Sequence, residues 1–326
     1  MAGITRFAII SLLASTVFAG PVLAQSEIYP TRPIRLIVPF TPGSGTDIVS
    51  RILAPKVTEN LGQQVVVDNR PGAGGIVGTE IVARATPDGY TIGLALTSHA
   101  INASLYRKLP YDSEKDFAAV TQLISTALVL VVSPSSPVNT VNELVAYVKS
   151  KPGQLSFASG GIGSPPHLAG ELLKTMTGIQ DIVHVPFGGG QPAINSTMSG
   201  QTVLYFAGTA AALPFVNAGR LKALAVTGKG RSPAYPSMPT MIEAGVPGYV
   251  VEQWYGILAP ARTPRGIIAK INAGYRKALQ EPEIKDRLKG LGVEPVGSTP
   301  EQFSAFLKSE IIKYEKIVKA SGARVD

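Results

Sequence analysis

The sequence predicts an α/β fold built from parallel sheets, and two observations carry this prediction. Short apolar segments rich in β-branched residues alternate along the chain with segments of helical periodicity, which is the order expected of parallel strands joined by crossover helices. The chain also has 326 residues, of which 45% are hydrophobic, and this is enough to bury a large core and to form two domains. No repeat period or low-complexity tract interrupts the alternation.

Strands are predicted where short apolar runs lie between turn residues. In chain order they are 34–39, 64–68, 91–96, 128–132, 155–158, 182–186, 203–206, 223–226 and 254–259. Helices are predicted between them, at 47–61, 77–84, 141–149, 167–177, 192–199, 265–279, 282–291 and 300–321. The first helix illustrates the pattern, because Ile48, Ile52 and Val57 share one face at helical spacing and should pack on a sheet.

Residues 1–24 stand apart from this alternation. A basic start with Arg6 precedes an apolar run from Phe7 to Gly20, and small residues precede Gln25. This layout is typical of a secretory signal peptide and is too short for a permanent membrane anchor. We therefore expect cleavage near Ala24 and a soluble periplasmic protein.

Composition narrows the classes of function. The absence of cysteine excludes disulfides, a lipid-modified cysteine and thiolate metal sites. The formal charge of +8 is spread along the chain, which suits attraction of small anions better than nucleic-acid binding, where a basic patch is usual. His99, His167 and His184 lie on different segments without carboxylates at ligand spacing. We expect no nucleic-acid partner, no metal and no cofactor.

The junction "PFTPGSGTDIVSR" joins the first predicted strand to its helix. Gly43 and Gly45 allow backbone conformations that other residues resist, and Thr46 or Asp47 can cap the first helical turn. Free backbone N–H groups and the positive end of the helix dipole would then face a ligand. No Lys-Ser or Lys-Thr follows the glycines, and Ile48 replaces the third glycine of the dinucleotide fingerprint, so nucleotides are disfavoured.

The same construction recurs at "SGGIGSPPHLAGELLK" and at "GGGQPAINSTM". Each stretch follows a predicted strand and opens a helix, with Pro165, Pro166 or Pro192 suited to the first turn. Ligands bind at the carboxyl ends of strands in α/β proteins, so these loops are expected to converge on an anion site.

Several ordered motifs together resemble one family. They are "PFTPGSGTDIVSR", "VVVDNRPGAGGIVGTEIVARATPDGYTIGLA", "SFASGGIGSPPHLAGELL", "VHVPFGGGQPAINSTMSGQ", "LKALAVTGKGRSPAYPSMPTMIEAGVPGY" and "WYGILAPARTPRGIIAKIN". From about Tyr29 to Asp326 the chain is similar to the Bug family, the TctC-like periplasmic substrate-binding receptors of tripartite tricarboxylate transporters.

The resemblance implies a type II periplasmic-binding-protein fold, in which two α/β domains close on a ligand in the cleft between them. It implies a first domain of residues 27–124 plus 228–326 and a second domain of residues 125–227. The apolar segments 128–132 and 223–226 lie where the chain would cross between these domains.

The resemblance also implies the cleft residues, because the family holds carboxylates largely through backbone N–H groups of two opposed loops. Carried over by motif, the ligand-binding residues are Phe40, Thr41, Gly43, Ser44, Gly45, Thr46, Asp47, Ser98, Ser159, Gly160, Gly163, Ser164, His167, Gly189, Gly190, Phe206 and Ala207.

The roles of two residues stay open at this point. Asp47 would repel an anion, so it either caps its helix or accepts a hydrogen bond from a ligand hydroxyl or ammonium. Trp254, the single tryptophan, belongs either to the core or to the cleft lining.

The chain departs from the family at two places. Phe187-Gly188 stand where many relatives have tyrosine and lysine, and Ala207 stands where an acidic or amide residue often follows Phe206. A tricarboxylate, a dicarboxylate, an aromatic acid and an acidic amino acid all remain candidate ligands. The departures favour a bulkier or aromatic acid.

The predicted function is capture of a small carboxylate by domain closure, as a monomer that delivers it to the membrane permease subunits of a tripartite tricarboxylate transporter. A periplasmic carboxylate sensor for a signalling membrane partner uses the same pocket and remains an alternative. An enzyme on this fold is less favoured, because the sequence lacks a Gly-x-Ser-x-Gly elbow, a cysteine nucleophile and a metal-ligand set.

Overall fold

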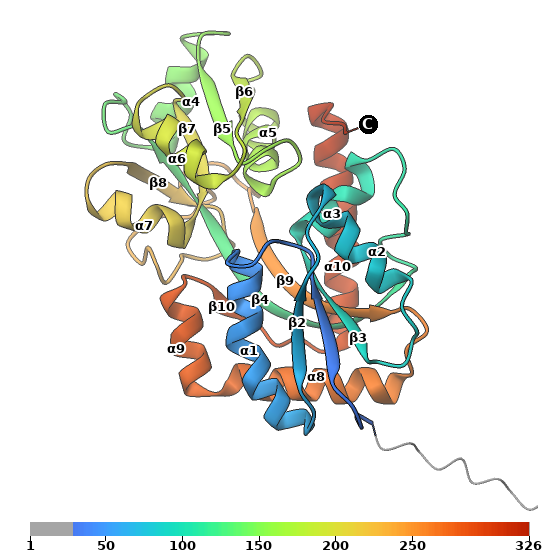
Figure 1. The fold of residues 1–326 in the computed structure, drawn as a ribbon. Coiled ribbons are helices and arrows are strands. Elements are labelled where there is room, and N and C mark those ends of the chain that lie inside the picture. The colour runs from blue at the N-terminus through green and yellow to red at the C-terminus, as the bar shows by residue number, and fades with distance from the viewer. Residues whose placement is uncertain (1–28, 326) are drawn as a thin grey trace, which may run out of the picture.

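The computed structural model describes residues 29–325, so the predicted signal peptide lies outside the described residues. Two lobes, each with a sheet covered by helices, lie one above the other (Figure 1). This arrangement confirms the predicted α/β fold. Within the described range, no helix is long and apolar enough to cross a membrane.

The helices and strands follow the predicted alternation closely. The strands are β1 (Ile34–Val38), β2 (Val65–Asn69), β3 (Thr91–Leu96), β4 (Phe117–Val132), β5 (Ser156–Ser159), β6 (Val183–Pro186), β7 (Leu204–Gly208), β8 (Lys222–Val226), β9 (Glu252–Pro260) and β10 (Glu294–Pro295). The helices are α1 (Gly45–Leu61), α2 (Ile76–Ala83), α3 (Thr97–Leu105), α4 (Val141–Lys149), α5 (Pro165–Thr177), α6 (Gly190–Met198), α7 (Thr209–Asn217), α8 (Arg265–Gln280), α9 (Pro282–Gly290) and α10 (Pro300–Ser321), with the 3₁₀ turn η1 (Ala73–Gly75).

Each lobe has a sheet of parallel strands completed by antiparallel ones. In the first lobe β2, β1 and β3 are parallel, and β9 and then β4 continue the sheet in antiparallel pairing. In the second lobe β6, β5 and β7 are parallel, and β4 pairs antiparallel with both β7 and β8. The strand β4 therefore belongs to both sheets, and its 16 residues form one connection between the lobes.

The chain returns to the first lobe between β8 and β9. Met241, Val246, Tyr249 and Val251 pack in the same buried cluster as the second-lobe strands. The backbone N–H of Val251 donates to the carbonyl oxygen of Thr227 at 3.0 Å, which ties this segment to the end of β8. The domain limit predicted after residue 227 stays a prediction. Because the side chains of residues 241–251 pack with the second-lobe strands, we propose instead that the chain returns to the first lobe at residue 251.

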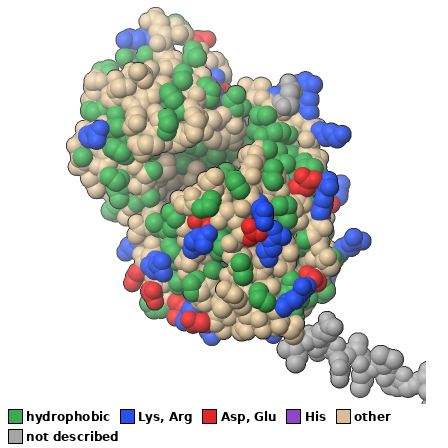
Figure 2. All heavy atoms as spheres, viewed as in Figure 1, with side chains coloured by type: hydrophobic (Ala, Val, Ile, Leu, Met, Phe, Trp, Pro, Cys, Tyr) green, Lys and Arg blue, Asp and Glu red, His purple; other side chains and the backbone are tan. Residues whose placement is uncertain are grey.

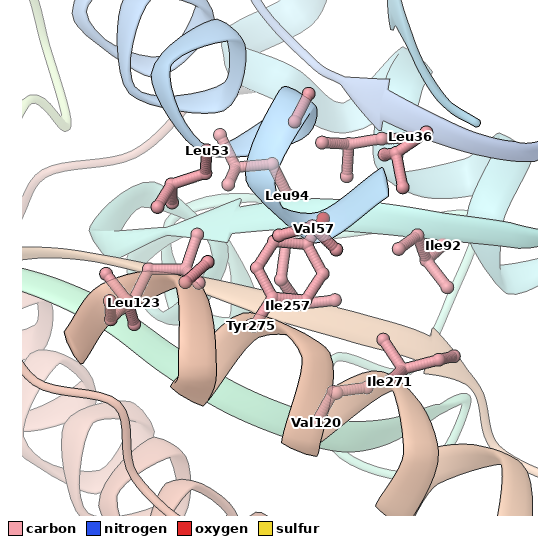
Figure 3. Packing of buried hydrophobic residues seen from close by; sticks show 14 of the residues in the cluster. Leu36, Leu53, Val57, Ile92, Leu94, Val120, Leu123, Ile257, Ile271 and Tyr275 are labelled. Atoms are coloured by element: carbon pink, nitrogen blue, oxygen red, sulfur yellow. The ribbon is translucent and has the colours of Figure 1, made fainter. Parts of the chain in front are cut away.

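The core of the first lobe lies between its sheet and helices α1 and α8. Tyr275 of α8 occupies the middle of this cluster (Figure 3). It is surrounded by Leu36, Leu53, Val57, Leu94, Ile257 and Ile271, which come from α1, β1, β3, β9 and α8. The apolar face predicted for the first helix is thus buried, although its first residue, Ile48, is 39% exposed at the cleft.

Helix α10 covers the other face of the first sheet and extends beside α3 and α5 (Figure 1). Leu168 of α5 is fully buried in the same cluster as Phe303 and Trp254, so the two lobes share apolar packing here. Trp254 is fully buried, and its indole N–H donates to the Glu310 carboxylate at 2.9 Å. Of the two alternatives for this tryptophan, the core position is confirmed.

Besides the two-residue strand β10 and the short turn η1, three elements were not predicted from the sequence. The first part of β4, before residue 128, carries Thr and Gln among its apolar residues, and so lacks a clear period. Helix α3 follows β3 with no intervening turn residue, and α7 contains Pro214, which normally disfavours a helix interior. The missing helices matter, because both begin at the cleft.

Gly256 on the central strand β9 is predicted to be required for packing of α10. A Cβ atom there would lie 2.2 Å from the Phe303 ring, so Gly256→Ala should lower the free energy of unfolding by about 1 to 3 kcal/mol. Urea denaturation of the chain without residues 1–24 measures this. Gly266→Ala in α8, where nothing lies within 4 Å of the new Cβ, is the matched control and should leave stability unchanged or slightly raised. Equal effects of the two substitutions would contradict the packing argument.

Candidate functional site

Two adjacent cavities lie between the lobes, with volumes of about 280 and 290 Å³. The molecule is hollowed at this level, and the surface of the hollow is apolar or uncharged (Figure 2). We call them the α3–α5 cavity and the α1–α7 cavity after the helices that begin there. Gln253 and Tyr255 of β9 line both cavities.

At each cavity, one helix from each lobe begins. The α3–α5 cavity is lined by Thr97 and Ser98 of α3 and by Ser164 and Pro165 at the start of α5. The α1–α7 cavity is lined by Gly45 of α1 and Thr209 of α7. All these helices follow strands whose carboxyl ends face the cleft, as expected for α/β sheets. Helix N-termini from both lobes therefore point at the space between them.

The loop before α1 is held by its own hydrogen bonds. Ser44 is the N-cap, and its hydroxyl accepts from the Asp47 N–H at 3.4 Å. Thr46 contacts the same hydroxyl at 2.8 Å. The N–H groups of Gly45 and Thr46 belong to the first turn, where a helix offers them no partner, so they are available to a ligand.

Asp47 organises this loop from within. Its carboxylate accepts from the Gly43 N–H at 2.9 Å, from the Asn69 amide at 3.0 Å and from Arg51 Nε at 2.9 and 3.0 Å. Burial alone would raise its pKa, but hydrogen bonds from Arg51, Gly43 and Asn69 outweigh this and hold the pKa below its usual value. The N-cap is Ser44, so the cap alternative for Asp47 is wrong. Both oxygens of the Asp47 carboxylate already accept hydrogen bonds from the protein.

The loop before α5 offers fewer helical N–H groups than expected. Pro165 and Pro166 occupy the first two helical positions and have no N–H to donate. The N–H of Gly161 donates to Ser159 Oγ at 3.1 Å, and that of Gly163 donates to His167 Nδ1 at 3.1 Å. The free donors of this anion cup are therefore loop amides such as Gly160 and Ile162, and not the helical turn itself.

His167 and His184 support this second loop from behind. Their rings stack at a centroid distance of 3.9 Å, and His184 Nε2 lies 2.7 Å from Ser159 Oγ. Burial, with the neighbouring imidazole and Lys174, lowers the pKa of His167 to about 3; burial and Lys174 lower that of His184 to about 4. Although His167 Nε2 is 3.9 Å from Glu171, a neutral ring forms no ion pair, and Glu171 pairs with Lys174 at 3.1 Å.

The structure brings together most of the residues that were predicted to bind the ligand. Those that line a cavity directly are Phe40, Gly45, Ser98, Gly160, Gly163 and Ser164. Others support these from the same loops, namely Thr41, Gly43, Ser44, Thr46, Asp47, Ser159 and His167. Gly189 and Gly190 lie behind Gly160, where a Cβ on Gly160 would come within 3.5 to 3.8 Å of their backbone.

Phe206 and Ala207 are not cleft residues. Both are fully buried, because consecutive side chains of β7 point to opposite faces of a sheet that is covered on both sides. Phe206 stacks on Tyr249 in one cluster, and Ala207 belongs to the other. The prediction that they line the cleft is corrected, and the preference for a bulkier acid loses the support that Ala207 gave it.

Several cavity residues were missed by the sequence analysis. Gly74 comes from the turn that precedes α2, whereas Asn102 and Tyr106 come from the end of α3 and just beyond. Gln253 and Tyr255 flank the buried Trp254 on β9, and strand alternation turns both toward the cleft. Only this alternation around a buried tryptophan could have indicated them from the sequence.

The cavities contain no charged side chain. Among the described residues that line them there is no Asp, Glu, Lys, Arg or His. Across residues 29–325, no group of three or more potential metal ligands is found either. The arrangement can hold a small anion through helix N-termini, loop amides and neutral polar side chains.

Asp47→Asn is predicted to destabilise the protein by about 1 to 3 kcal/mol at pH 7, because the charge-assisted bonds with Arg51 are lost. The pKa of Asp47 is lowered by folding, so the wild-type advantage is present above the ordinary value of 3.8 and is lost as pH falls below it. Urea denaturation at pH 7 and at pH 3 measures the gap. Asp286→Asn, at an exposed site on α9, is the control. A gap independent of pH would contradict this assignment.

Acid should destabilise the second loop through His167. Its pKa falls from 6.5 to about 3 on folding, so its stabilising contribution is complete above pH 6.5 and declines below it. Between pH 7 and pH 5, His167→Gln should remove on the order of 1 to 2 kcal/mol from the pH dependence of the free energy of unfolding. Parallel pH profiles of the variant and the wild type would contradict a neutral, buried His167.

Comparisons with known proteins agree with this geometry. A family model described as the tripartite tricarboxylate transporter family receptor matches residues 49–323. BugT of Bordetella pertussis is 36% identical over 315 residues, which cover 96% of each chain. An R. palustris protein solved with adipate is 36% identical, with a TM-score of 0.79 over 90% of this chain and 98% of that chain. MatC of Rhodopseudomonas palustris with bound malate is 33% identical, with a TM-score of 0.76 over 89% and 100%.

These matches confirm the resemblance to Bug proteins and the two-domain periplasmic-binding-protein fold. The chain belongs to the family of tripartite tricarboxylate transporter receptors.

Proposed function

We propose that this receptor captures a small carboxylate in the periplasm and delivers it to the permease subunits of a tripartite tricarboxylate transporter. One observation carries the proposal: helix N-termini from both lobes converge on two cavities that lack any charged side chain in the described chain. The relatives solved with adipate and with malate support the carboxylate class.

Neutral cavities of this kind suit an anion that must later be released. Each helix N-terminus contributes partial positive charge, worth about 0.3 to 1 kcal/mol for an exposed anion. Free N–H donors come from the first turn of α1 and from the loop before α5. A carboxylate held this way needs no arginine, whose bidentate pairing would be harder to break at the permease. The dispersed net charge of +8 also attracts anions to the molecule as a whole.

Capture is proposed to work by closure of the lobes. Gly163 of the second lobe packs so tightly on Leu105 of the first that an added Cβ would lie 2.1 Å from its Cδ2. A ligand that contacts both lobes favours the conformation in which these surfaces meet. The strand β4 and the return crossing are the connections about which such closure can occur.

The alternatives have less support. An enzyme would need a general acid or base at the site, and no carboxylate or imidazole of the described residues lines either cavity. A sensor would bind the same ligand and differ only in its membrane partner. No feature of the described surface favours that partner over a permease.

Thermal unfolding in the presence of adipate and of malate tests the function. A ligand that binds only the native state at 100 times its dissociation constant stabilises by about 2.7 kcal/mol and should raise the Tm by on the order of 5 °C. No rise with these acids or with other mono-, di- and tricarboxylates would overturn the carboxylate assignment.

Gly163→Ala tests closure. The new methyl group should meet Leu105 and keep the lobes apart, so affinity for the acid found in the thermal screen should fall at least tenfold by calorimetry. Gly178→Ala at the end of the same helix is the matched control. Its φ of 71° matches the 74° of Gly163, but nothing lies within 4 Å of its new Cβ. Equal losses of affinity would attribute the effect to backbone strain and refute closure at this contact.

A further inference from the structure

Among the described residues, neither cavity has a carboxylate that could pair with an amino group of a ligand. A ligand amino group needs a carboxylate or several free acceptors when it is removed from water. No carboxylate of the described chain lines either cavity, and the nearest candidate suggested by the sequence, Asp47, is fully engaged with Gly43, Asn69 and Arg51. An ammonium in the cleft would have no counter-charge.

Most polar side chains in the cavities are already bonded to the protein. Ser98 and Asn102 both donate to the Gly74 carbonyl, at 3.4 and 3.2 Å. In the other cavity, Thr126 and Thr209 both donate to the Gly292 carbonyl, at 3.0 and 3.3 Å. The hydroxyl groups of Ser98, Thr126 and Thr209 therefore have no proton left to donate to a ligand, although they can still accept from one.

Two further side chains are bonded in the same way. Thr97 Oγ1 accepts from the backbone N–H of Trp254 at 3.0 Å, and Ser164 Oγ donates to the Gly161 carbonyl at 2.7 Å. Among the described cavity residues, Tyr106, Gln253 and Tyr255 have side-chain polar groups without a hydrogen-bond partner. These three side chains keep all their donors and acceptors for a ligand.

Tyr255 is placed to donate into the cleft. Its hydroxyl would lie 3.1 Å from a Cβ on Gly45, which puts it beside the first turn of α1. Burial raises the pKa of Tyr255 to about 12, so the hydroxyl keeps its proton at neutral pH. Gln253, two residues earlier on the same strand, lines both cavities with it.

The remaining cavity surface is apolar. Phe40, Leu96, Leu105 and Ile162 line the α3–α5 cavity, and Ile48, Val49, Leu291 and Val293 line the α1–α7 cavity. Ile162 is 52% exposed and Ile48 is 39% exposed, one on each side of the cleft. Exposed apolar side chains at a binding cleft provide a surface for an apolar part of a ligand.

We propose that the cleft selects carboxylates that have an apolar body and no amino group, and that Gln253 and Tyr255 contact the ligand. The inference rests on the proposed function and narrows it, because it excludes the acidic amino acids among the candidate ligands. An amino group here would face helix N-termini, whose partial positive charge repels it.

Calorimetry with matched pairs of acids tests the selectivity. The pairs are succinate and L-aspartate, glutarate and L-glutamate, and adipate and L-2-aminoadipate, which differ only in the amino group. In every pair with a binding member, the amino acid should bind at least tenfold more weakly. Galactarate, which has the carbon chain of adipate with four hydroxyl groups, should also bind at least tenfold more weakly than adipate.

Gln253→Glu tests the contact directly. The new carboxylate is nearly the same shape, repels a second carboxylate and attracts an ammonium, so it should shift the ratio of affinities toward the amino acid at least tenfold. Gln280→Glu, exposed at the end of α8 and outside both cavities, is the matched control for added charge and should leave the ratio unchanged.

The outcomes separate the selectivity from the function. An amino acid that binds as tightly as its amine-free partner would overturn the selectivity and leave the carboxylate receptor standing. An unchanged ratio in Gln253→Glu would overturn the contact assigned to Gln253. If no acid bound, either in this panel or in the wider screen of mono-, di- and tricarboxylates, the proposed function would fail, and the selectivity with it.

Discussion

The architecture depends on one shared strand. The first part of β4 pairs with β9 in the first lobe, and residues 128–132 pair with β7 and β8 in the second. Because backbone pairing fixes each sheet relative to this strand, the carboxyl ends of the parallel strands in both lobes face one another across the cleft. The helices that follow those strands then begin at the cleft, and this places the N–H groups of their first turns or preceding loops around the two cavities.

Charged side chains support the loops of the site, but none of them lies on the cavity surface that a ligand would contact. Asp47, Arg51 and Asn69 form a bonded group beneath the first loop, and the stacked imidazoles of His167 and His184 support the second. Paired or neutral groups at these positions fix the loop backbones without presenting a net charge to the cleft. Attraction for an anion is left to dipoles and amides, which remain in place when the ligand leaves.

The two lobes also meet outside the cleft. Helix α10 carries packing from the first sheet to α5, where Leu168 is buried with Phe303 and Trp254. The Gly163 and Leu105 contact lies at the start of the same helix α5. A motion of the lobes must therefore preserve or replace this apolar packing, which makes a few discrete arrangements more favourable than a continuous range.

The sequence by itself determined the α/β class, most strands and helices and the positions of the glycine-rich loops, because periodicity, glycine and proline are local properties. It also indicated an anion site, since free N–H groups follow from any capped helix start. It did not reveal α3, which has no turn residue before its start, or α7, whose interior contains Pro214. The roles of Asp47, His167 and Phe206 were equally beyond it.

Tertiary structure decided those roles, because each depends on partners far along the chain. Asp47 is held by Asn69, His167 stacks on His184, and Phe206 is buried on Tyr249. Gln253 and Tyr255 face the cleft because β9 lies between β3 and β4 and the side chain of Trp254 points into the core. The elements that cover each face of the sheet decide which side chains of a central strand are buried. This packing joins distant segments, so the local sequence does not predict it.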